Sequence, residues 1–308
     1  MIGPGTVTSR LGGTALGLVL DRVLGEPPSA IHPVAWFGRA MGGVERATWR
    51  DSTAAGAAYA GLGMGLGAAF GGATRSTAVA TWILVAGRQL RDVARSVGAT
   101  ARTDPARART ELPALVGRDP SGLDQSGIAA AVIESVAENS VDAVFAPVLW
   151  AAAAGPAGAG AYRALNTLDA MVGSRAPRYA RFGTASARGD DVANWLPARL
   201  FAVAVALVRP RRARLIWRTV RRDAPAHPSP NAGVAEAAMA AVLGVELGGP
   251  LRYGDRVEER PRLGTGSRPT LDDVPAAIRV ADHAERLLLS LLLAGAVAAW
   301  RLGRRRTS

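Results

Sequence analysis

The side chains that could do chemistry in this chain are carboxylates and amides that recur at helical spacings. Glu134, Glu138 and Asp142 are four residues apart, so a helix would place all three on one face. With Asn139 beside them, their oxygens could hold Mg²⁺ while phosphate groups complete the coordination. The alternative is a solvated acidic helix start that the helix dipole stabilises. Long apolar runs beside these carboxylates favour a functional site.

Two further polar blocks follow along the chain. Asn166 and Asp169 share a helical face, although Gly173 could simply close a polar helix end there. The next block combines oxygen ligands suited to Mg²⁺ with arginines that could clamp a phosphate or carboxylate. Its members are Ser186, Arg188, Asp190, Asp191, Asn194 and Arg199. The alternative for this block is a capped helix start with an Asp–Arg surface pair.

A fourth polar block runs from His227 to Glu236 and begins with a turn that two prolines make rigid. Ser229 or Asn231 can cap the helix that follows, and its N-terminus would offer free N–H groups to an anion. A purely structural turn fits the pattern equally well. His32, in the sequence Ile-His-Pro-Val, can likewise be a functional residue or part of a purely structural turn.

The composition predicts a membrane protein built from helices. Apolar residues make up 49% of the 308 residues, charged residues make up 20%, and the mean hydropathy is +0.13. Ala, Leu, Val and Gly supply most of the apolar mass, which favours close-packed helices over strands. We therefore expect an all-α integral membrane protein, with residues 1–308 as one polytopic helical bundle. Polar inter-helix segments, at 118–142, 166–199 and 223–255, would form the site.

The residue types that are missing exclude several kinds of site. All 37 basic residues are Arg and the formal net charge is +12. Without Lys there is no Walker-type phosphate loop and no Lys Schiff base. Without Cys there is no disulfide or thiolate chemistry, and the three His residues are too scattered for a His-based zinc motif. The Arg excess suits contact with anionic lipid and the positive-inside bias of membrane proteins. Nucleic-acid binding is a weak alternative, because the sequence has no basic stripe interleaved with aromatic residues.

The chain has six apolar runs that are candidate membrane spans, at 11–24, 53–73, 77–90, 141–165, 196–208 and 287–300. Small residues every fourth position in the second run, such as Gly61 and Gly65, indicate a tightly packed helix. The last run has only about fourteen residues, which is short for a full span and favours a tilted, interfacial or re-entrant helix.

Each polar block lies at the end of an apolar run, so we expect the four blocks to converge on one pocket at the cytoplasmic membrane edge. A straight helix over 141–165 would hold its two ends about 35 Å apart and would separate the first two blocks. Convergence therefore requires this run to fold back. Gly155-Pro156, near its middle, is the predicted break.

The blocks, taken together and in this order, resemble the CobD/CbiB family of cobalamin biosynthesis, the adenosylcobinamide-phosphate synthases. The resemblance covers about residues 16–255, and Arg163 and Arg175 keep the charge where relatives often carry Lys. The motifs that carry it are Gly25-Glu26-Pro27, His32-Pro33-Val34, Val116-Gly117-Arg118-Asp119, Glu134-Ser135-Val136-Ala137-Glu138-Asn139, Asn166-Thr167-Leu168-Asp169, Asp190-Asp191-Val192-Ala193-Asn194 and His227-Pro228-Ser229-Pro230-Asn231.

The resemblance implies a multi-pass enzyme of the cytoplasmic membrane with its site facing the cytoplasm. Such an enzyme joins a carboxylate of adenosylcobyric acid to the amine of (R)-1-amino-2-propanol phosphate, or of a close analogue. ATP would be the co-substrate and Mg²⁺ the cofactor. Its partners would be these substrates and the lipid bilayer, with no nucleic acid. A homo-oligomer, or association with other membrane enzymes of cobalamin assembly, stays open.

The resemblance and the residue chemistry together divide the site residues into three expected roles. The expected metal ligands are Asp142, Asp169, Asp190 and Asp191. The expected catalytic residues are Glu134, Glu138, Asn139, His227, Asn231 and Glu236. The residues expected to bind substrate or phosphate are His32, Arg118, Asn166, Ser186, Arg188, Asn194 and Arg199.

Two other functions are compatible with parts of the pattern. A membrane phosphotransferase would also use paired aspartates and Mg²⁺, but it would transfer a phospho-alcohol and release a nucleotide monophosphate. A non-catalytic membrane sensor related to the family would not need the complete set of Asp, Asn and Arg blocks. Analysis of the product separates these alternatives, because an amide-forming ligase yields an amide and cleaved ATP.

Overall fold

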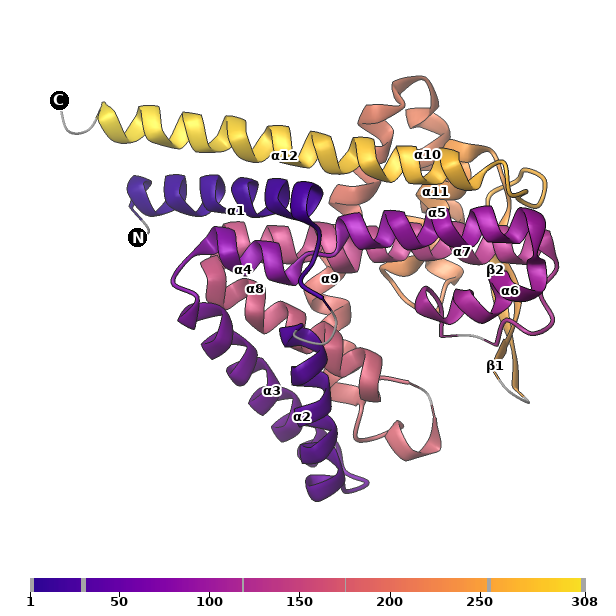
Figure 1. The fold of residues 1–308 in the computed structure, drawn as a ribbon, viewed down its shortest axis with the longest axis horizontal. Coiled ribbons are helices and arrows are strands. Elements are labelled where there is room, and N and C mark those ends of the chain that lie inside the picture. Colours follow the sequence, from indigo (N-terminus) through magenta and orange to yellow (C-terminus); the bar gives the residue numbers. More distant parts are fainter. Residues whose placement is uncertain (1–2, 29–31, 118, 175, 254–255, 306–308) are drawn as a thin grey trace. The chain divides into compact units, whose positions relative to one another are not determined.

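The computed structural model describes residues 3–28, 32–117, 119–174, 176–253 and 256–305. Arg118 and Arg175 therefore lie outside the described residues. The elements, in chain order, are α1 (Pro4–Leu24), α2 (Pro33–Thr48), α3 (Thr53–Ala73), α4 (Thr77–Leu84), α5 (Gly87–Thr103), α6 (Pro105–Glu111), α7 (Gln125–Ser140), a π-helical turn (Val141–Phe145), α8 (Ala146–Val172), α9 (Thr184–Val208), α10 (Ala213–Asp223), α11 (Ala232–Leu243), β1 (Leu247–Tyr253), β2 (Arg256–Leu263) and α12 (Val274–Arg304) (Figure 1).

The expected all-α membrane class is confirmed. Among the described residues, three helical stretches are long and apolar enough to cross a membrane, at Gln125–Val172, Thr184–Val208 and Val274–Arg304. The last apolar run lies within a longer helix than expected, because α12 has 31 residues and extends well beyond residues 287–300. Only 6% of the apolar window of α12 is buried inside the protein. Such an exposed apolar helix requires lipid or a partner around it.

The other apolar runs correspond to helices with somewhat different ends. The run at 53–73 coincides with α3, whereas the run at 11–24 is the second part of α1, and the run at 196–208 is the second half of α9. The run at 77–90 is divided, because α4 ends at Leu84 and α5 begins at Gly87. Hydropathy thus located the helices, while the helix ends depend on caps and turns.

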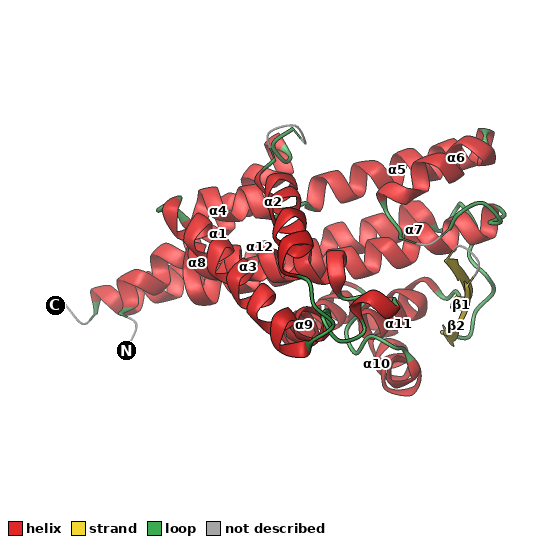
Figure 2. Ribbon diagram, turned by 90° about the horizontal axis from the view of Figure 1, so that it is seen from below, coloured by secondary structure: helices red, strands yellow, loops and turns green. Residues whose placement is uncertain are grey.

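One short sheet interrupts the helical pattern. The strands β1 and β2, yellow in Figure 2, form an antiparallel pair with a bulge between Leu247 and Gly249. Gly248 and Gly249 both have positive φ, at 77° and 94°, which glycine adopts without strain. This hairpin was not expected from the sequence, because neither strand shows the alternation of apolar and polar residues that marks a half-buried strand.

The chain divides into two compact units, each assembled from separate stretches of sequence. Unit 1 comprises residues 1–87, 142–194 and 289–308, and unit 2 comprises residues 88–141 and 195–288. The four boundaries therefore fall inside helical stretches, at Gly87/Arg88, Val141/Asp142, Asn194/Trp195 and Leu288/Leu289.

Unit 1 is held together by close packing of α3 against α8. A Cβ atom built on Gly67 would lie 2.4 Å from the backbone oxygen of Gly160, and one on Gly71 would lie 2.1 Å from that of Pro156. Only glycine allows such an approach of two helices. The glycines expected to make this contact, Gly61 and Gly65, have nothing within 4 Å of an added Cβ. The α3 helix packs tightly through small residues, as expected, but through the face that carries Gly67 and Gly71 and not the one that carries Gly61 and Gly65.

The run from Val141 to Leu165 is broken at the predicted position. Gly155 has φ 72° and ψ −161°, which no helix residue adopts, and Pro156 follows it without an N–H group. The Arg10 guanidinium of α1 donates a hydrogen bond of 2.6 Å to the backbone oxygen of Ala153, beside the break. The Ala153 backbone oxygen next to the break therefore has a hydrogen-bond donor, which a backbone group in apolar surroundings requires.

Unit 2 is built around α7 and α11, which pack against each other. Every residue of α11 from Ala232 to Val242 is buried, as are the residues of α7 from Ile128 to Ala137. Ala and Gly make most of these contacts possible, because small side chains let the two backbones approach. Asp124 caps α7 as expected, with its side chain accepting a 2.7 Å hydrogen bond from the Gly127 N–H.

Candidate functional site

Unit 1 contains a network of polar side chains centred on Asn166. The Asn166 amide donates hydrogen bonds to a carboxylate oxygen of Asp142, at 3.3 Å, and to one of Asp190, at 3.2 Å. The Asn194 amide donates to the other oxygen of Asp190 at 2.9 Å. The Tyr162 hydroxyl donates to Asn194 Oδ1 at 2.9 Å and lies 3.1 Å from the backbone oxygen of Asp142. We call these five residues the Asn166 network.

Three separate helical segments supply this network. Asp142 lies in the π-helical turn, Tyr162 and Asn166 lie one turn apart on α8, and Asp190 and Asn194 lie one turn apart on α9. Asp142 and Asn166 are 24 positions apart in the sequence and yet share a hydrogen bond. A straight helix would hold them about 36 Å apart. The predicted fold-back of this run is therefore confirmed.

The network places two carboxylates beside amide donors. Asp190 and Asn194 are buried, whereas Asp142 and Asn166 are half-buried, so one side of the network remains open. Amide N–H donors stabilise the ionised form of each carboxylate, since an ionised carboxylate only accepts hydrogen bonds. The arrangement therefore offers negative oxygen atoms that are already oriented by neutral partners.

Ser186 lies one helical turn before Asp190 on the same face of α9. Its side chain is fully buried, and its hydroxyl has no hydrogen-bond partner among the described residues. A buried hydroxyl without a partner costs free energy, so it is a candidate donor for a bound molecule. Its expected contact with substrate stays a prediction.

Arg163 borders the network, since its Nη1 atom donates to Asn166 Oδ1 at 3.2 Å, whereas other expected residues of unit 1 have different surroundings. A Cβ on Gly173 would lie 1.8 Å from Asp169 Oδ1, which places the Asp169 carboxylate against the glycine that closes α8. Asp191 is half-buried and Arg188 is exposed. Within the described ranges, no group of three or more His, Asp or Glu side chains could hold a metal ion. Of the four expected ligands, the structure brings together Asp142 and Asp190.

Tyr162 is the member of the network that the sequence did not suggest. It was passed over because it lies inside an apolar run and because its motif begins only at Asn166. The available signal was its position four residues before Asn166, which places both side chains on one face of a helix.

Unit 2 contains a second buried polar group, formed by His227, Arg260 and Glu236. The Arg260 guanidinium donates to His227 Nε2 at 3.0 Å, and Glu236 lies 3.9 Å from the same nitrogen. Because guanidinium only donates, Nε2 must be the acceptor and the neutral imidazole carries its proton on Nδ1. His227 Nδ1 lies 3.1 Å from both the backbone oxygen and the backbone nitrogen of Ser229, and with its proton on Nδ1 the ring donates to the oxygen. Both ring nitrogens are therefore occupied.

Glu134 connects α7 to the hairpin. Its carboxylate accepts a hydrogen bond of 2.8 Å from the backbone N–H of Gly248, at the β-bulge, and its side chain is buried. Asn139 donates to the backbone oxygen and to the hydroxyl of Ser135, both at 3.0 Å, whereas Glu138 is exposed. The three residues of this motif thus have three different surroundings, although the helical spacing had suggested one common face.

The turn before α11 is built by side-chain hydrogen bonds. The Ser229 hydroxyl accepts from the backbone N–H groups of Asn231 and Ala232, at 3.3 and 3.2 Å, so Ser229 rather than Asn231 caps the helix. Asn231 instead accepts a 2.9 Å hydrogen bond from Arg199, whose guanidinium stacks 4.5 Å over the Trp195 ring. This cation–π contact fixes the guanidinium plane.

His32 has a structural role in unit 1. Its Nδ1 accepts a hydrogen bond of 3.3 Å from the Val34 N–H and so caps α2, and its Nε2 lies 3.1 Å from the Glu26 carboxylate. Its expected contact with substrate stays a prediction.

Many of the expected site residues lie on helices, whereas His32, His227 and Asn231 lie in the turns before α2 and α11, so the expectation of a site built from inter-helix loops holds only in part. The Asn166 network uses α8, α9 and a π-helical turn, and Glu134, Glu138 and Glu236 lie on α7 and α11. Helices hold side chains more rigidly than loops do, which suits a site that must keep charged groups in place. The convergence of all four blocks on one pocket stays a prediction.

Comparison with known proteins identifies the relatives of this chain. The family model described as CobD/Cbib protein matches residues 14–281. The chain is 44% identical over 290 residues to the cobalamin biosynthesis protein CobD of Mycobacterium tuberculosis strain H37Rv, covering 89% of this chain and 91% of the relative. It is 41% identical over 300 residues to CobD of Chromobacterium violaceum, covering 92% and 95%. It is 38% identical over 301 residues to CbiB of Salmonella typhimurium strain LT2, covering 90% and 94%. No solved structure gives a significant match.

Proposed function

The chain belongs to the CobD/CbiB protein family and takes part in cobalamin biosynthesis, and we propose that it is an ATP-dependent, amide-forming ligase. Its substrates would be adenosylcobyric acid and (R)-1-amino-2-propanol phosphate, or a close analogue. The product would be adenosylcobinamide phosphate. The site would face the cytoplasm, where ATP is available.

The observation that carries this proposal is the meeting of Asp142 and Asp190 on Asn166. Two carboxylates from separate helical segments lie within 3.3 Å of one amide nitrogen. Holding two like charges together is unfavourable unless a cation or a substrate joins them. The Arg163 guanidinium, which donates to the same Asn166 and attracts Asp190, offsets part of this repulsion, and the pair supports a site that receives a further cationic group.

The residues present fit Mg²⁺. This ion takes oxygen ligands, keeps several waters, and is commonly bound through one or two carboxylates together with substrate phosphates. Asp142 and Asp190 would provide those two carboxylates, and Asn194 and Asn166 would orient them. When bound, Mg²⁺ would neutralise charge on the phosphate groups of ATP. Asp169 and Asp191 are not required for this arrangement.

The chain's own side chains would act on the substrates in distinct ways. The Ser186 hydroxyl would donate to an oxygen of the bound substrate, because it has no partner among the described residues. Arg188 is exposed on the same helix and would neutralise a phosphate that approaches from solvent. In unit 2, Arg199 is already oriented by Trp195 and Asn231 and is suited to a bidentate contact with phosphate.

The amine of the second substrate must lose a proton before it attacks the activated carboxylate. His227 is a poor base for this step, since its Nε2 already accepts from Arg260 and its Nδ1 faces a carbonyl oxygen. Its role would be to position Arg260. The proton would instead pass to a carboxylate, and Glu236 and Glu138 are the candidates.

The test is a product assay with the full-length protein in detergent. Adenosylcobyric acid, aminopropanol phosphate and MgATP are added, and the mass of the corrin product is measured. Amide formation with cleavage of ATP would support the ligase. A phospho-alcohol product with release of a nucleotide monophosphate, or no turnover at all, would contradict it.

Asp190→Asn tests the role of the carboxylate pair. Its turnover should fall by more than about 100-fold, the upper end of what second-shell changes at metal sites cost. Asp92→Asn is the control, because Asp92 is an exposed residue of α5 whose side chain is 53% accessible. Asp191→Asn should lose much less activity than Asp190→Asn. Near-normal turnover of Asp190→Asn would remove Asp190 from the metal assignment.

A further inference from the structure

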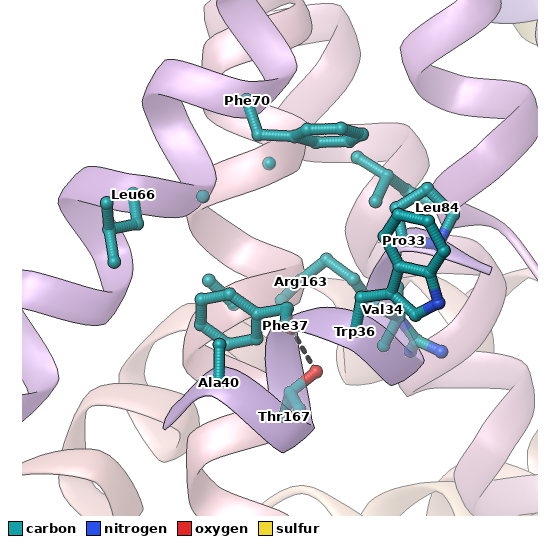
Figure 3. Close-up of a pocket in the computed structure, with 13 residues that line it drawn as sticks. Pro33, Val34, Trp36, Phe37, Ala40, Leu66, Phe70, Leu84, Arg163 and Thr167 are labelled. Carbon is teal, nitrogen blue, oxygen red and sulfur yellow. Dashed lines mark hydrogen bonds between the residues drawn. The ribbon is translucent and has the colours of Figure 1, made fainter. Parts of the chain in front are cut away.

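Unit 1 contains an apolar pocket that the proposed reaction does not use. It has a volume of about 330 Å³ and lies between α2, α3, α4 and α8 (Figure 3). Its walls are mainly aromatic and aliphatic, with Trp36 and Phe37 from α2, Leu66 and Phe70 from α3, and Leu84 from α4. Pockets that bind small ligands begin at about 300 Å³. This one is therefore large enough for a flexible chain and too small for a corrin ring with its side chains.

One charged side chain lines this apolar pocket. This residue is Arg163 of α8, and its Nε atom is buried without a hydrogen-bond partner among the described residues. The Nη1 atom donates to Asn166 Oδ1 at 3.2 Å, which is a neutral acceptor. No ion pair balances Arg163 within the part of the chain that the structure describes. A guanidinium on a helix that enters a membrane is costly unless an anion joins it.

The pocket lies next to a surface that is suited to lipid. Leu62, Leu66 and Phe70 are spaced by four residues along α3 and are 48%, 48% and 42% exposed. Trp36, on the opposite wall of the pocket, is 55% exposed. Exposed apolar stripes of this kind mark contact with a membrane or with a partner. A molecule that leaves the bilayer could therefore enter the pocket without crossing water.

We infer that this pocket binds one acyl chain of an anionic membrane phospholipid, with the lipid phosphate on Arg163. The apolar walls match the chain, and the guanidinium matches the phosphate, to which it can donate more than one hydrogen bond. A second protein helix would also cover apolar walls, but it would leave the buried Nε atom of Arg163 without an acceptor. The inference concerns a site outside the proposed ligase chemistry.

The pocket is connected to the Asn166 network by a single hydrogen bond. Arg163 contacts the amide oxygen of Asn166, and the amide nitrogen of the same residue contacts Asp142 and Asp190. A phosphate on Arg163 would hold its guanidinium on the pocket side and so fix the orientation of the Asn166 amide. A bound lipid would therefore stabilise the network as well as the pocket.

Native mass spectrometry of the full-length protein in detergent tests the inference. The protein is titrated with phosphatidylglycerol, with phosphatidylcholine of the same acyl chains, and with inorganic phosphate. Phosphatidylglycerol should bind at least about tenfold more tightly than phosphatidylcholine, because both lipids carry the phosphate but the choline cation would lie near the Arg163 guanidinium and repel it. Inorganic phosphate should not bind. Equal binding of both lipids, or binding of phosphate alone, would overturn the inference.

Two variants on one helix locate the bound lipid. Leu66→Trp should fill the pocket and reduce phosphatidylglycerol binding by at least about tenfold. Leu62→Trp is the matched control, because Leu62 is equally exposed one turn earlier and does not line the pocket. Arg163→Gln should remove the preference for the anionic lipid. Equal lipid binding by the two tryptophan variants would refute the location, and loss of a protein dimer in Leu66→Trp alone would assign the pocket to a second copy of the chain.

Discussion

The contact between α3 and α8 gives the sharpest prediction about stability. Gly67→Ala adds one methyl group where a Cβ atom would lie 2.4 Å from the backbone oxygen of Gly160 and 2.5 Å from Ala164 Cβ. Carbon atoms normally rest about 3.5–4.0 Å apart, so the helices must separate by about 1 Å. Since one of the obstructing atoms belongs to a helix backbone, no side-chain rotation can relieve the contact.

The matched control is Gly65→Ala, two positions earlier on the same helix. Nothing lies within 4 Å of a Cβ at Gly65, so this change only improves helix propensity, by up to about 1 kcal/mol. Overpacking at Gly67 costs about 1–3 kcal/mol, and the same propensity gain offsets part of it. We therefore expect the two variants to differ by about 1–3 kcal/mol in unfolding free energy. For a protein of this size the difference corresponds to roughly 2–12 °C in Tm.

The same variant should also affect turnover. The part of α8 that follows Gly160 carries Tyr162 and Asn166, so a displacement of about 1 Å would disturb the network and cost about 100-fold in rate. Thermal unfolding in detergent, followed by circular dichroism, and the amide-forming assay are measured on both variants and on the unchanged protein. If Gly67→Ala unfolds at the temperature of Gly65→Ala and keeps its turnover, the close packing of α3 on α8 is wrong.

Three further predictions concern the break, the hairpin and the acid range. Gly155→Ala should lower the unfolding free energy by about 1–3 kcal/mol, because its φ of 72° and ψ of −161° suit only glycine; an unchanged Tm would contradict the break. Glu134→Ala should leave the Gly248 N–H without its acceptor and speed hydrogen exchange of that amide. Glu134→Gln keeps an acceptor oxygen and should restore the protection. If both variants lose turnover while Glu134→Gln keeps the protection, Glu134 is a catalytic carboxylate instead. The hydrogen bond from Arg222 holds the pKa of Asp223 below its ordinary value, so its stabilising contribution is present above about pH 4 and is lost as the pH falls through the lower folded pKa. Asp223→Asn should therefore flatten the loss of unfolding free energy below about pH 4, and an unaltered slope would refute this.

Local features of this chain were predictable because they depend on neighbours in the sequence. Long apolar runs without strand alternation indicate membrane helices, and Asp124 indicates a helix cap. The break at Gly155 follows from the covalent structure of Pro156, which has no N–H group to donate, and from the freedom of glycine. The spacing of Asp190 and Asn194 placed them one turn apart, and they are joined by a hydrogen bond of 2.9 Å.

Contacts between segments that are distant in the sequence could not be predicted in this way. Helical periodicity shows which residues share a face, but it does not show which face meets another helix. The glycines of α3 illustrate this, since Gly65 and Gly67 have the same composition around them and only Gly67 meets α8. The hairpin and the hydrogen bond from Gly248 to Glu134 were missed for the same reason.

The candidate site shows the same division. The sequence by itself determined which residues carry the chemistry, because carboxylates and amides stand out against long apolar runs. Only the tertiary structure decided that Asp142 joins Asp190, that Tyr162 belongs with them, and that Asp169 lies against Gly173 instead. It also decided that Arg260 donates a hydrogen bond to His227 Nε2. The physical reason is that residue type sets what a side chain can bind, whereas the packing of distant helices sets which partner comes within hydrogen-bond distance.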